Sequence, residues 1–127
     1  MKVVTIIAQV LVGLTFVFFG SNAFLHFMNP PPPSGLAGQF ITVLYVSNWL
    51  LFVGAIQVIG GALVLVNRFV PLGLLLLGPV IFNILLFHGL LNHTGWQPGV
   101  VMALLWTFLM FRYKKNFAGV FEAKPAL

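Results

Sequence analysis

Four long apolar runs occupy most of this chain and restrict it to folds that are stable in lipid. They cover residues 3–27, 40–66, 70–91 and 98–111 of 127, and the helix that contains the fourth run is expected to span 98–113. The chain is 61% hydrophobic and 6% charged, which leaves too little polar surface for a water-soluble protein of 14.0 kDa. A helix of roughly 20 residues crosses a bilayer, and these runs do not alternate as barrel strands would. We therefore predict an all-α membrane protein with one domain, residues 1–127, folded as an antiparallel bundle of four transmembrane helices.

The positive charges predict the direction in which each helix crosses the membrane. Cations precede the first run, join the second to the third and follow the fourth, at Lys2, Arg68, Arg112, Lys114, Lys115 and Lys124. The connections at residues 28–39 and 92–97 carry none. Because cytoplasmic loops collect Lys and Arg, we expect a multi-pass protein of the inner (cytoplasmic) membrane with both termini cytoplasmic and a basic tail from about residue 112. A signal peptide cleaved near residues 20–23 is the alternative, but the first run is longer than such a peptide needs.

Acidic and thiol groups are nearly absent, which excludes several classes of function. Glu122, in the tail, is the one carboxylate side chain, and there is no cysteine. Proton relays and cation sites in membranes depend on buried Asp or Glu, and thiol redox chemistry depends on Cys. The cations form no basic face with interleaved aromatic residues, so nucleic acid is not an expected partner. Any chemistry must therefore use imidazole, amide or hydroxyl groups.

Small residues predict where two of the helices pack closely. They share one face of each helix and are Gly13 and Gly20 in the first run and Gly54 and Gly61 in the second. These faces are expected to meet inside the bundle. Gln9 and Gln57 lie on the same faces, so an amide pair between them is an allowed structural link, with a ligand contact as the alternative.

Prolines mark two departures from regular helix. Residues 30–33 are four consecutive prolines, which predict a stiff extended arm that serves as a spacer, with docking of a partner as the alternative. Pro79 follows Gly78 inside the third run and should kink that helix or leave the carbonyl near Leu75 unpaired.

Histidine and asparagine side chains gather at the helix ends without charges and form the candidate site. In an up-and-down bundle these ends lie at one level, so the residues could line a pocket for a quinone ring or a small polar head group. Anchoring of helix ends at the head-group level is the simpler interpretation, and a metal or haem is not favoured. The candidate residues are Asn22, His26, Asn48, Asn83 and His88.

The order of these motifs resembles that of the DoxX-like family of small four-helix membrane proteins. The likeness lies in GLTFVFFGSNAFLHF (residues 13–27), VGAIQVIGGALVLVNRFVPLG (53–73) and LGPVIFNILLFHGLL (77–91). The resemblance implies a four-helix bundle, and a family in which some members are subunits of thiosulfate:quinone oxidoreductase or associate with membrane redox partners. By residue, it points to Gly20, Asn83 and His88.

Three functional hypotheses follow. The first is an accessory or structural subunit of a membrane redox complex, without catalysis of its own. The second is a quinone- or small-ligand-binding component of a membrane oxidoreductase, which would use the His and Asn pocket. The third, a small transporter or channel, is disfavoured by the lack of charged residues inside the runs. The expected partners are the lipid bilayer and either another membrane protein or further copies of this chain.

Overall fold

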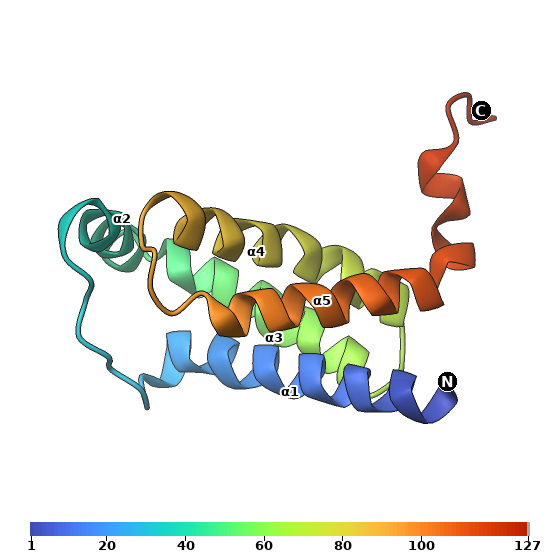
Figure 1. Cartoon of the computed structure of the whole chain (residues 1–127), viewed down its shortest axis with the longest axis horizontal. Coiled ribbons are helices and arrows are strands. Elements are labelled where there is room, and N and C mark those ends of the chain that lie inside the picture. The colour runs from blue at the N-terminus through green and yellow to red at the C-terminus, as the bar shows by residue number, and fades with distance from the viewer. Residues whose placement is uncertain (127) are drawn as a thin grey trace.

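The structure, a computed structural model, describes residues 1–126, and within them it is all-helical. Four helices lie side by side along the long axis of the molecule, and two shorter elements lie at its two ends (Figure 1). Around the bundle, α1 packs on α3, α3 on α4, α4 on α5, and α5 on α1. The elements are α1 (Lys2–Leu25), α2 (Gly35–Val46), α3 (Trp49–Leu65), α4 (Val70–Leu90), α5 (Gln97–Arg112) and a 3-10 helix, η1 (Lys114–Phe121).

Two or three of these helices are long and apolar enough to cross a membrane. The α1 and α4 helices, with 24 and 21 residues, each meet this condition alone. The α2 and α3 helices meet it together, as one bent pair, and α5 is a shorter apolar helix of 16 residues. At 1.5 Å per residue, α5 spans about 24 Å, less than the roughly 30 Å of a hydrocarbon core. The fold is therefore compatible with a membrane protein.

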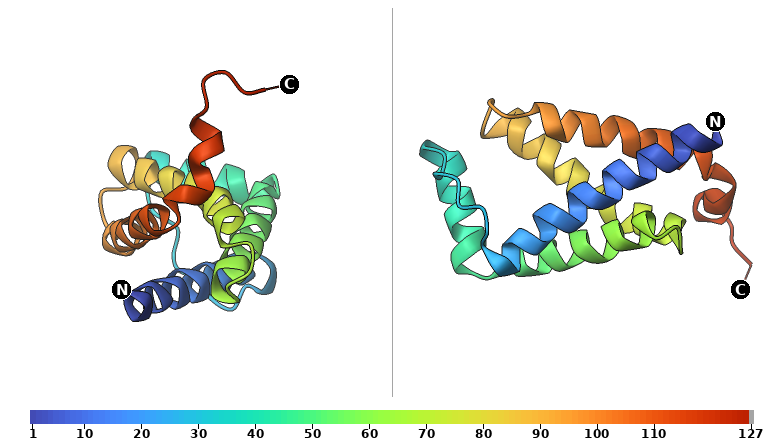
Figure 2. Two further views of the ribbon diagram at one scale, coloured as in Figure 1. Left: turned by 90° about the vertical axis from the view of Figure 1, so that its right-hand side faces the viewer. Right: turned by 90° about the horizontal axis from the view of Figure 1, so that it is seen from below.

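The second apolar run is not one helix, so the prediction of a continuous helix over residues 40–66 is wrong. The run divides into α2 and α3, whose axes differ by 82°. The break lies at Ser47 and Asn48. Asn48 adopts the left-handed conformation (φ 64°), which asparagine tolerates better than most residues, and the Ser47 hydroxyl accepts a hydrogen bond from the Trp49 N–H at 3.3 Å. As a result, α2 lies across the end of the bundle (Figure 2).

The closest helix contact is between α1 and α3, as the glycines predict. A Cβ atom built on Gly13 would lie 2.9 Å from the Gly61 carbonyl oxygen, and one built on Gly20 would lie 2.7 Å from the Gly54 carbonyl oxygen. The two glycine faces thus meet backbone to backbone. On the other side of α3, Gly60 lies against α4 in the same manner. Glycines let α3 approach both neighbours, as expected where van der Waals packing carries helix association.

The amide pair between Gln9 and Gln57 that the sequence allows does not form. In an antiparallel contact that sets Gly13 opposite Gly61, Gln9 lies near the end of α3, whereas Gln57 lies opposite Gly20, about three turns away. Gln9 is instead buried and fully hydrogen-bonded near the end of the bundle. Its Nε2 donates to the Val64 carbonyl (3.2 Å) and to Asn67 Oδ1 (3.0 Å), and its Oε1 accepts from the Tyr113 hydroxyl (2.6 Å).

Pro79 lies inside α4, and the helix continues through it to Leu90. The adjoining Gly78 leaves room for the Trp106 ring of α5, because a Cβ atom there would lie 3.0 Å from Trp106 Cζ2. The Trp106 indole N–H donates to the Leu74 carbonyl at 2.9 Å, one residue before the carbonyl that Pro79 leaves without its helical donor. The Gly-Pro step is therefore where α5 docks on α4.

Candidate ligand-binding site

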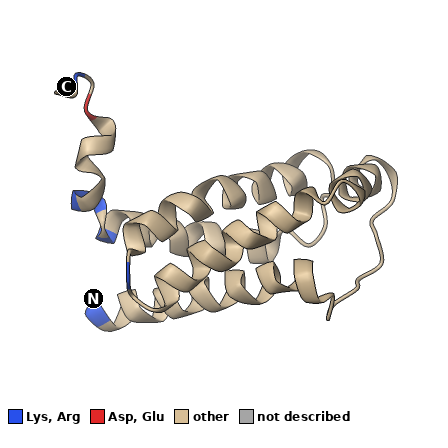
Figure 3. Ribbon diagram, turned by 180° about the vertical axis from the view of Figure 1, so that it is seen from behind, with Lys and Arg blue, Asp and Glu red and all other residues tan. Residues whose placement is uncertain are grey.

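The bend between α2 and α3 borders a cavity, open on one side, at one end of the bundle. The arm of residues 26–34 leaves α1, crosses this end and enters α2 (Figure 2). The arm, α2 and the ends of α1, α3 and α4 together line a cavity of about 690 Å³. This volume lies within the range of small-molecule sites. The arm and α2, which line the cavity, lie at the end of the bundle opposite the cations (Figure 3).

The lining combines apolar surface with several polar side chains. Apolar groups come from the arm prolines 30–33 and from Ile41, Leu50, Leu51 and Phe87. Polar groups come from α1, the arm, α2, the α2–α3 break and the residues after α4, and they are Asn22, His26, Asn29, Thr42, Tyr45, Asn48 and Asn92. Such a mixture suits an amphipathic organic molecule, whose ring or head group hydrogen-bonds while its body contacts the apolar wall.

Some of these polar groups hold the arm in place. Asn22 Oδ1 accepts a hydrogen bond from the Met28 N–H at 2.8 Å, and Asn29 Nδ2 donates to the His26 carbonyl at 3.0 Å. Asn92 Oδ1 accepts from the Thr94 hydroxyl at 2.9 Å. These oxygen and amide groups are already hydrogen-bonded to the backbone or to neighbouring side chains. Their main role is to shape the cavity.

Three side chains that line the cavity keep their hydrogen-bonding groups free within residues 1–126. They are the His26 imidazole, the Tyr45 hydroxyl and the Asn48 amide. The His26 and Tyr45 rings meet edge to face, with centroids 6.0 Å apart. Together these groups offer both donors and acceptors, as a quinone, hydroxyl or amide head group would require.

The structure brings together three of the five predicted site residues. Asn22, His26 and Asn48 all line the cavity. Asn83 and His88 do not. Asn83 is exposed on α4 and its Nδ2 donates to the Pro79 carbonyl at 2.8 Å.

His88 acts at the end of α4. Its Nδ1 lies 3.1 Å from the Asn92 carbonyl oxygen, and its ring packs edge to face on Phe87 at 5.2 Å. Phe87, not His88, faces the cavity. His88 therefore contacts the cavity wall through Asn92 and lies outside the lining itself.

Tyr45 and the proline arm are the lining groups that the sequence interpretation missed. Tyr45 lies among apolar residues in the run 40–66 and was not interpreted as a site residue. The pair Ser47 and Asn48 was the available signal, since both residue types favour turns. The arm was interpreted as a spacer, yet all four of its prolines line the cavity.

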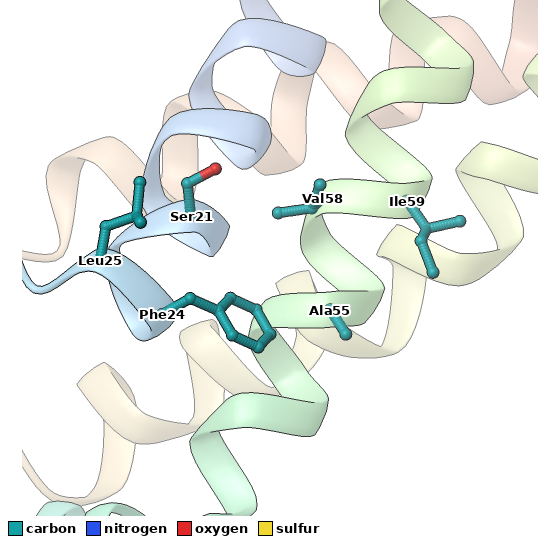
Figure 4. Close-up of a pocket in the computed structure, with 6 residues that line it drawn as sticks. All are labelled: Ser21, Phe24, Leu25, Ala55, Val58 and Ile59. Atoms are coloured by element: carbon teal, nitrogen blue, oxygen red, sulfur yellow. The ribbon is translucent and has the colours of Figure 1, made fainter.

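A second, smaller hollow lies on the side of the bundle between α1 and α3. It measures about 320 Å³, and Ser21 is its one polar lining residue. The Phe24 ring reaches from α1 toward Ala55 of α3 across its floor (Figure 4). Within the described residues, no three His, Cys, Asp or Glu side chains are grouped to hold a metal ion.

Comparisons of the chain with known protein families, with curated proteins and with solved structures found no match.

Proposed function

We propose that this protein is a DoxX-like, four-span protein of the inner membrane that binds a small amphipathic molecule with a quinone-like head group. In this arrangement α1, α3, α4 and α5 are the spans, both termini are cytoplasmic, and α2 lies at the opposite membrane surface. The gathering of all six cations at one end of the bundle supports this topology (Figure 3). The short α3 and α5 helices would thin the bilayer locally.

One observation carries the ligand proposal: three polar side chains with free hydrogen-bonding groups line a cavity of about 690 Å³ whose walls are otherwise largely apolar. In this topology the cavity lies where hydrocarbon meets head groups. A quinone could place its ring carbonyls near Tyr45 and Asn48 and extend its tail toward lipid. His26 would then be the nearest group able to exchange a proton with a bound ring.

The protein is also proposed to work as a component of a larger membrane redox complex, by itself non-catalytic. It has no cysteine, and its one acidic side chain lies in the tail, so the chain supplies neither a thiol couple nor a carboxylate relay. Electrons would have to come from a partner. Purification in a gentle detergent, followed by mass spectrometry of co-purifying proteins, is expected to recover such a partner.

Binding of a short-chain ubiquinone analogue to the purified protein tests the site. Tyr45→Phe removes one hydroxyl, and Asn48→Gly removes the amide while keeping a residue that tolerates φ 64°. Each loses about one hydrogen bond, so we expect affinity to fall about fivefold in each variant. Asn83→Ala is the matched control, because this asparagine lies outside the cavity, and its affinity should not change.

Two results would count against the ligand proposal. The first is that Asn83→Ala lowers the affinity for the analogue as much as Asn48→Gly does. The second is that folded wild-type protein does not bind the analogue and that extracts of the purified protein contain no quinone. In the second case, recovery of a stable partner complex would favour a purely accessory role.

A further inference from the structure

The last element of the chain carries features of a membrane-surface helix. The η1 helix leaves the end of α5 and runs nearly perpendicular to the bundle (Figure 1). If the bundle axis follows the membrane normal, η1 lies parallel to the membrane surface. Phe117 is buried against the bundle core and fixes η1 in this position. The tail is thus attached to the bundle at its midpoint.

Exposed apolar and cationic residues lie along the rest of η1. Phe121 is 81% exposed and Val120 is 64% exposed. Side chains three residues apart align on a 3-10 helix, so Lys115, Ala118 and Phe121 form one exposed row. A helix that exposes lysines together with large apolar side chains suits the boundary between acyl chains and head groups, because a long lysine side chain reaches the head groups while an aromatic ring enters the acyl region.

Positive charge at this end is almost uncompensated. Six cationic side chains share one acidic side chain, Glu122. Arg112 is already oriented, because its Nε donates to Thr5 Oγ1 at 2.9 Å, and within residues 1–126 its two Nη groups make no hydrogen bond. A guanidinium held in this way presents its remaining donors to a phosphate. Lys2 begins α1 and Arg68 lies between α3 and α4. The Lys and Arg residues gather at this one end of the bundle (Figure 3).

We propose that η1 and this cationic end form a binding surface for anionic phospholipids. Arg112, Lys114 and Lys115 contact lipid phosphates, and Val120 and Phe121 enter the acyl region. The surface requires membrane insertion but does not depend on the cavity at the other end. It would hold the tail on the bilayer and keep the bundle at a fixed depth.

The chain lacks cysteine, so single labels test this directly. Ala118→Cys, carrying a polarity-sensitive fluorophore, is placed in nanodiscs of phosphatidylcholine alone or mixed with phosphatidylglycerol. We expect a blue-shifted emission and protection from an aqueous quencher in the anionic discs, and loss of both in Lys114→Gln/Lys115→Gln. Native mass spectrometry should show that retention of phosphatidylglycerol over phosphatidylcholine falls about fivefold per lysine removed.

Controls separate this surface from general effects. A label at His93→Cys, at the opposite end, should not respond to lipid charge or to the lysine substitutions. Val120→Ser/Phe121→Ser should expose the label while leaving helical content unchanged. A label open to the quencher in both lipids overturns the proposal, as does protection that ignores lipid charge. Protection seen in native membranes but absent from nanodiscs would show that a protein partner, not lipid, covers η1.

Discussion

Single glycines set how closely α1 and α3 approach. At Gly13, a Cβ atom would lie 2.6 Å from Leu65 Cβ, and at Gly54 a Cβ atom would lie 2.6 Å from Ala23 Cβ. Contacts this short leave no room for any larger residue without moving a helix. In a membrane, where lipid tails are as apolar as the helix surfaces, this fit and not burial from water would hold the pair together.

Gly13→Leu should therefore separate α1 from α3 and lower the free energy of unfolding by at least about 1–3 kcal/mol. Denaturation in mixed detergent micelles measures this change. Gly89→Leu is the control, because no atom lies within 4 Å of a Cβ built there. Equal destabilisation by both substitutions would contradict the close-contact interpretation.

The buried Gln9 amide depends on partners from two other parts of the chain. Tyr113→Phe leaves Gln9 Oε1 without its donor, and an unpaired buried polar group costs about 1–3 kcal/mol. Gln9→Leu removes the amide together with its need for partners. We expect the double variant Gln9→Leu/Tyr113→Phe to lose less stability than the two single losses added together. Strict additivity in the same unfolding assay would show that the two side chains are not coupled.

Among the elements, α5 is short, and Trp106 makes its side-chain hydrogen bond to the α4 backbone. Trp106 fills the space over Gly78 and donates to the Leu74 carbonyl. Pro79 leaves the next carbonyl, that of Leu75, without its helical donor. The indole N–H therefore adds a hydrogen bond beside the interrupted step of α4 but does not replace the missing one.

Trp106→Phe keeps most of the ring but removes this donor. We expect a loss of about 1 kcal/mol in the free energy of unfolding. Trp96→Phe is the matched control, since Trp96 is 48% exposed and precedes α5. A loss in the control as large as in Trp106→Phe would mean that the hydrogen bond to Leu74 contributes nothing.

At the scale of the whole molecule, charge and cavity lie at opposite ends of the bundle. The Lys and Arg residues gather at the end with the termini, whereas the arm and α2, which line the cavity, lie at the other end (Figure 3). In a membrane this separation would place the candidate site on the surface away from the basic side. Ligand would then reach it from the outer leaflet or from the periplasmic side.

Labelling in intact cells tests that orientation. A membrane-impermeant maleimide should react with His93→Cys without permeabilisation and with Lys124→Cys only after it. Both residues are exposed, so access depends on the side of the membrane alone. The opposite pattern would invert the topology and place the cavity in the cytoplasmic leaflet.

Features of the fold that depend on neighbouring residues in the sequence could be predicted, whereas features that depend on tertiary contacts could not. The starts of α4 and α5 follow from prolines in their first turns, and both helices end close to the expected residues. The break in residues 40–66 was missed because Ser47 and Asn48 resemble ordinary polar residues inside a span. The direction of α2 depends on tertiary contacts, such as burial of Ala37, which no local pattern encodes.

The same reason separates the predicted site from the observed cavity. Asn22, His26 and Asn48 lie at helix ends, so a simple up-and-down bundle already brings them to one level. We predicted that Asn83 and His88 join them because of their positions along the axis of α4. What a side chain contacts also depends on the face of the helix that carries it, and these two residues do not line the cavity. Tyr45 joins the cavity because α2 turns.

Two residues of the cavity also carry the turns that build it, and this limits how the site can vary. His26 (φ 53°) ends α1 and Asn48 (φ 64°) precedes α3, both in the left-handed conformation. At such positions Gly, Asn and Asp are the readily accepted replacements. Homologous sequences that take a different ligand should therefore diverge first at Tyr45 and Thr42, within regular helix, and retain the types found at 26 and 48. In a saturation library scored for folding and for ligand binding, we expect fewer folded variants at positions 26 and 48 than at positions 42 and 45.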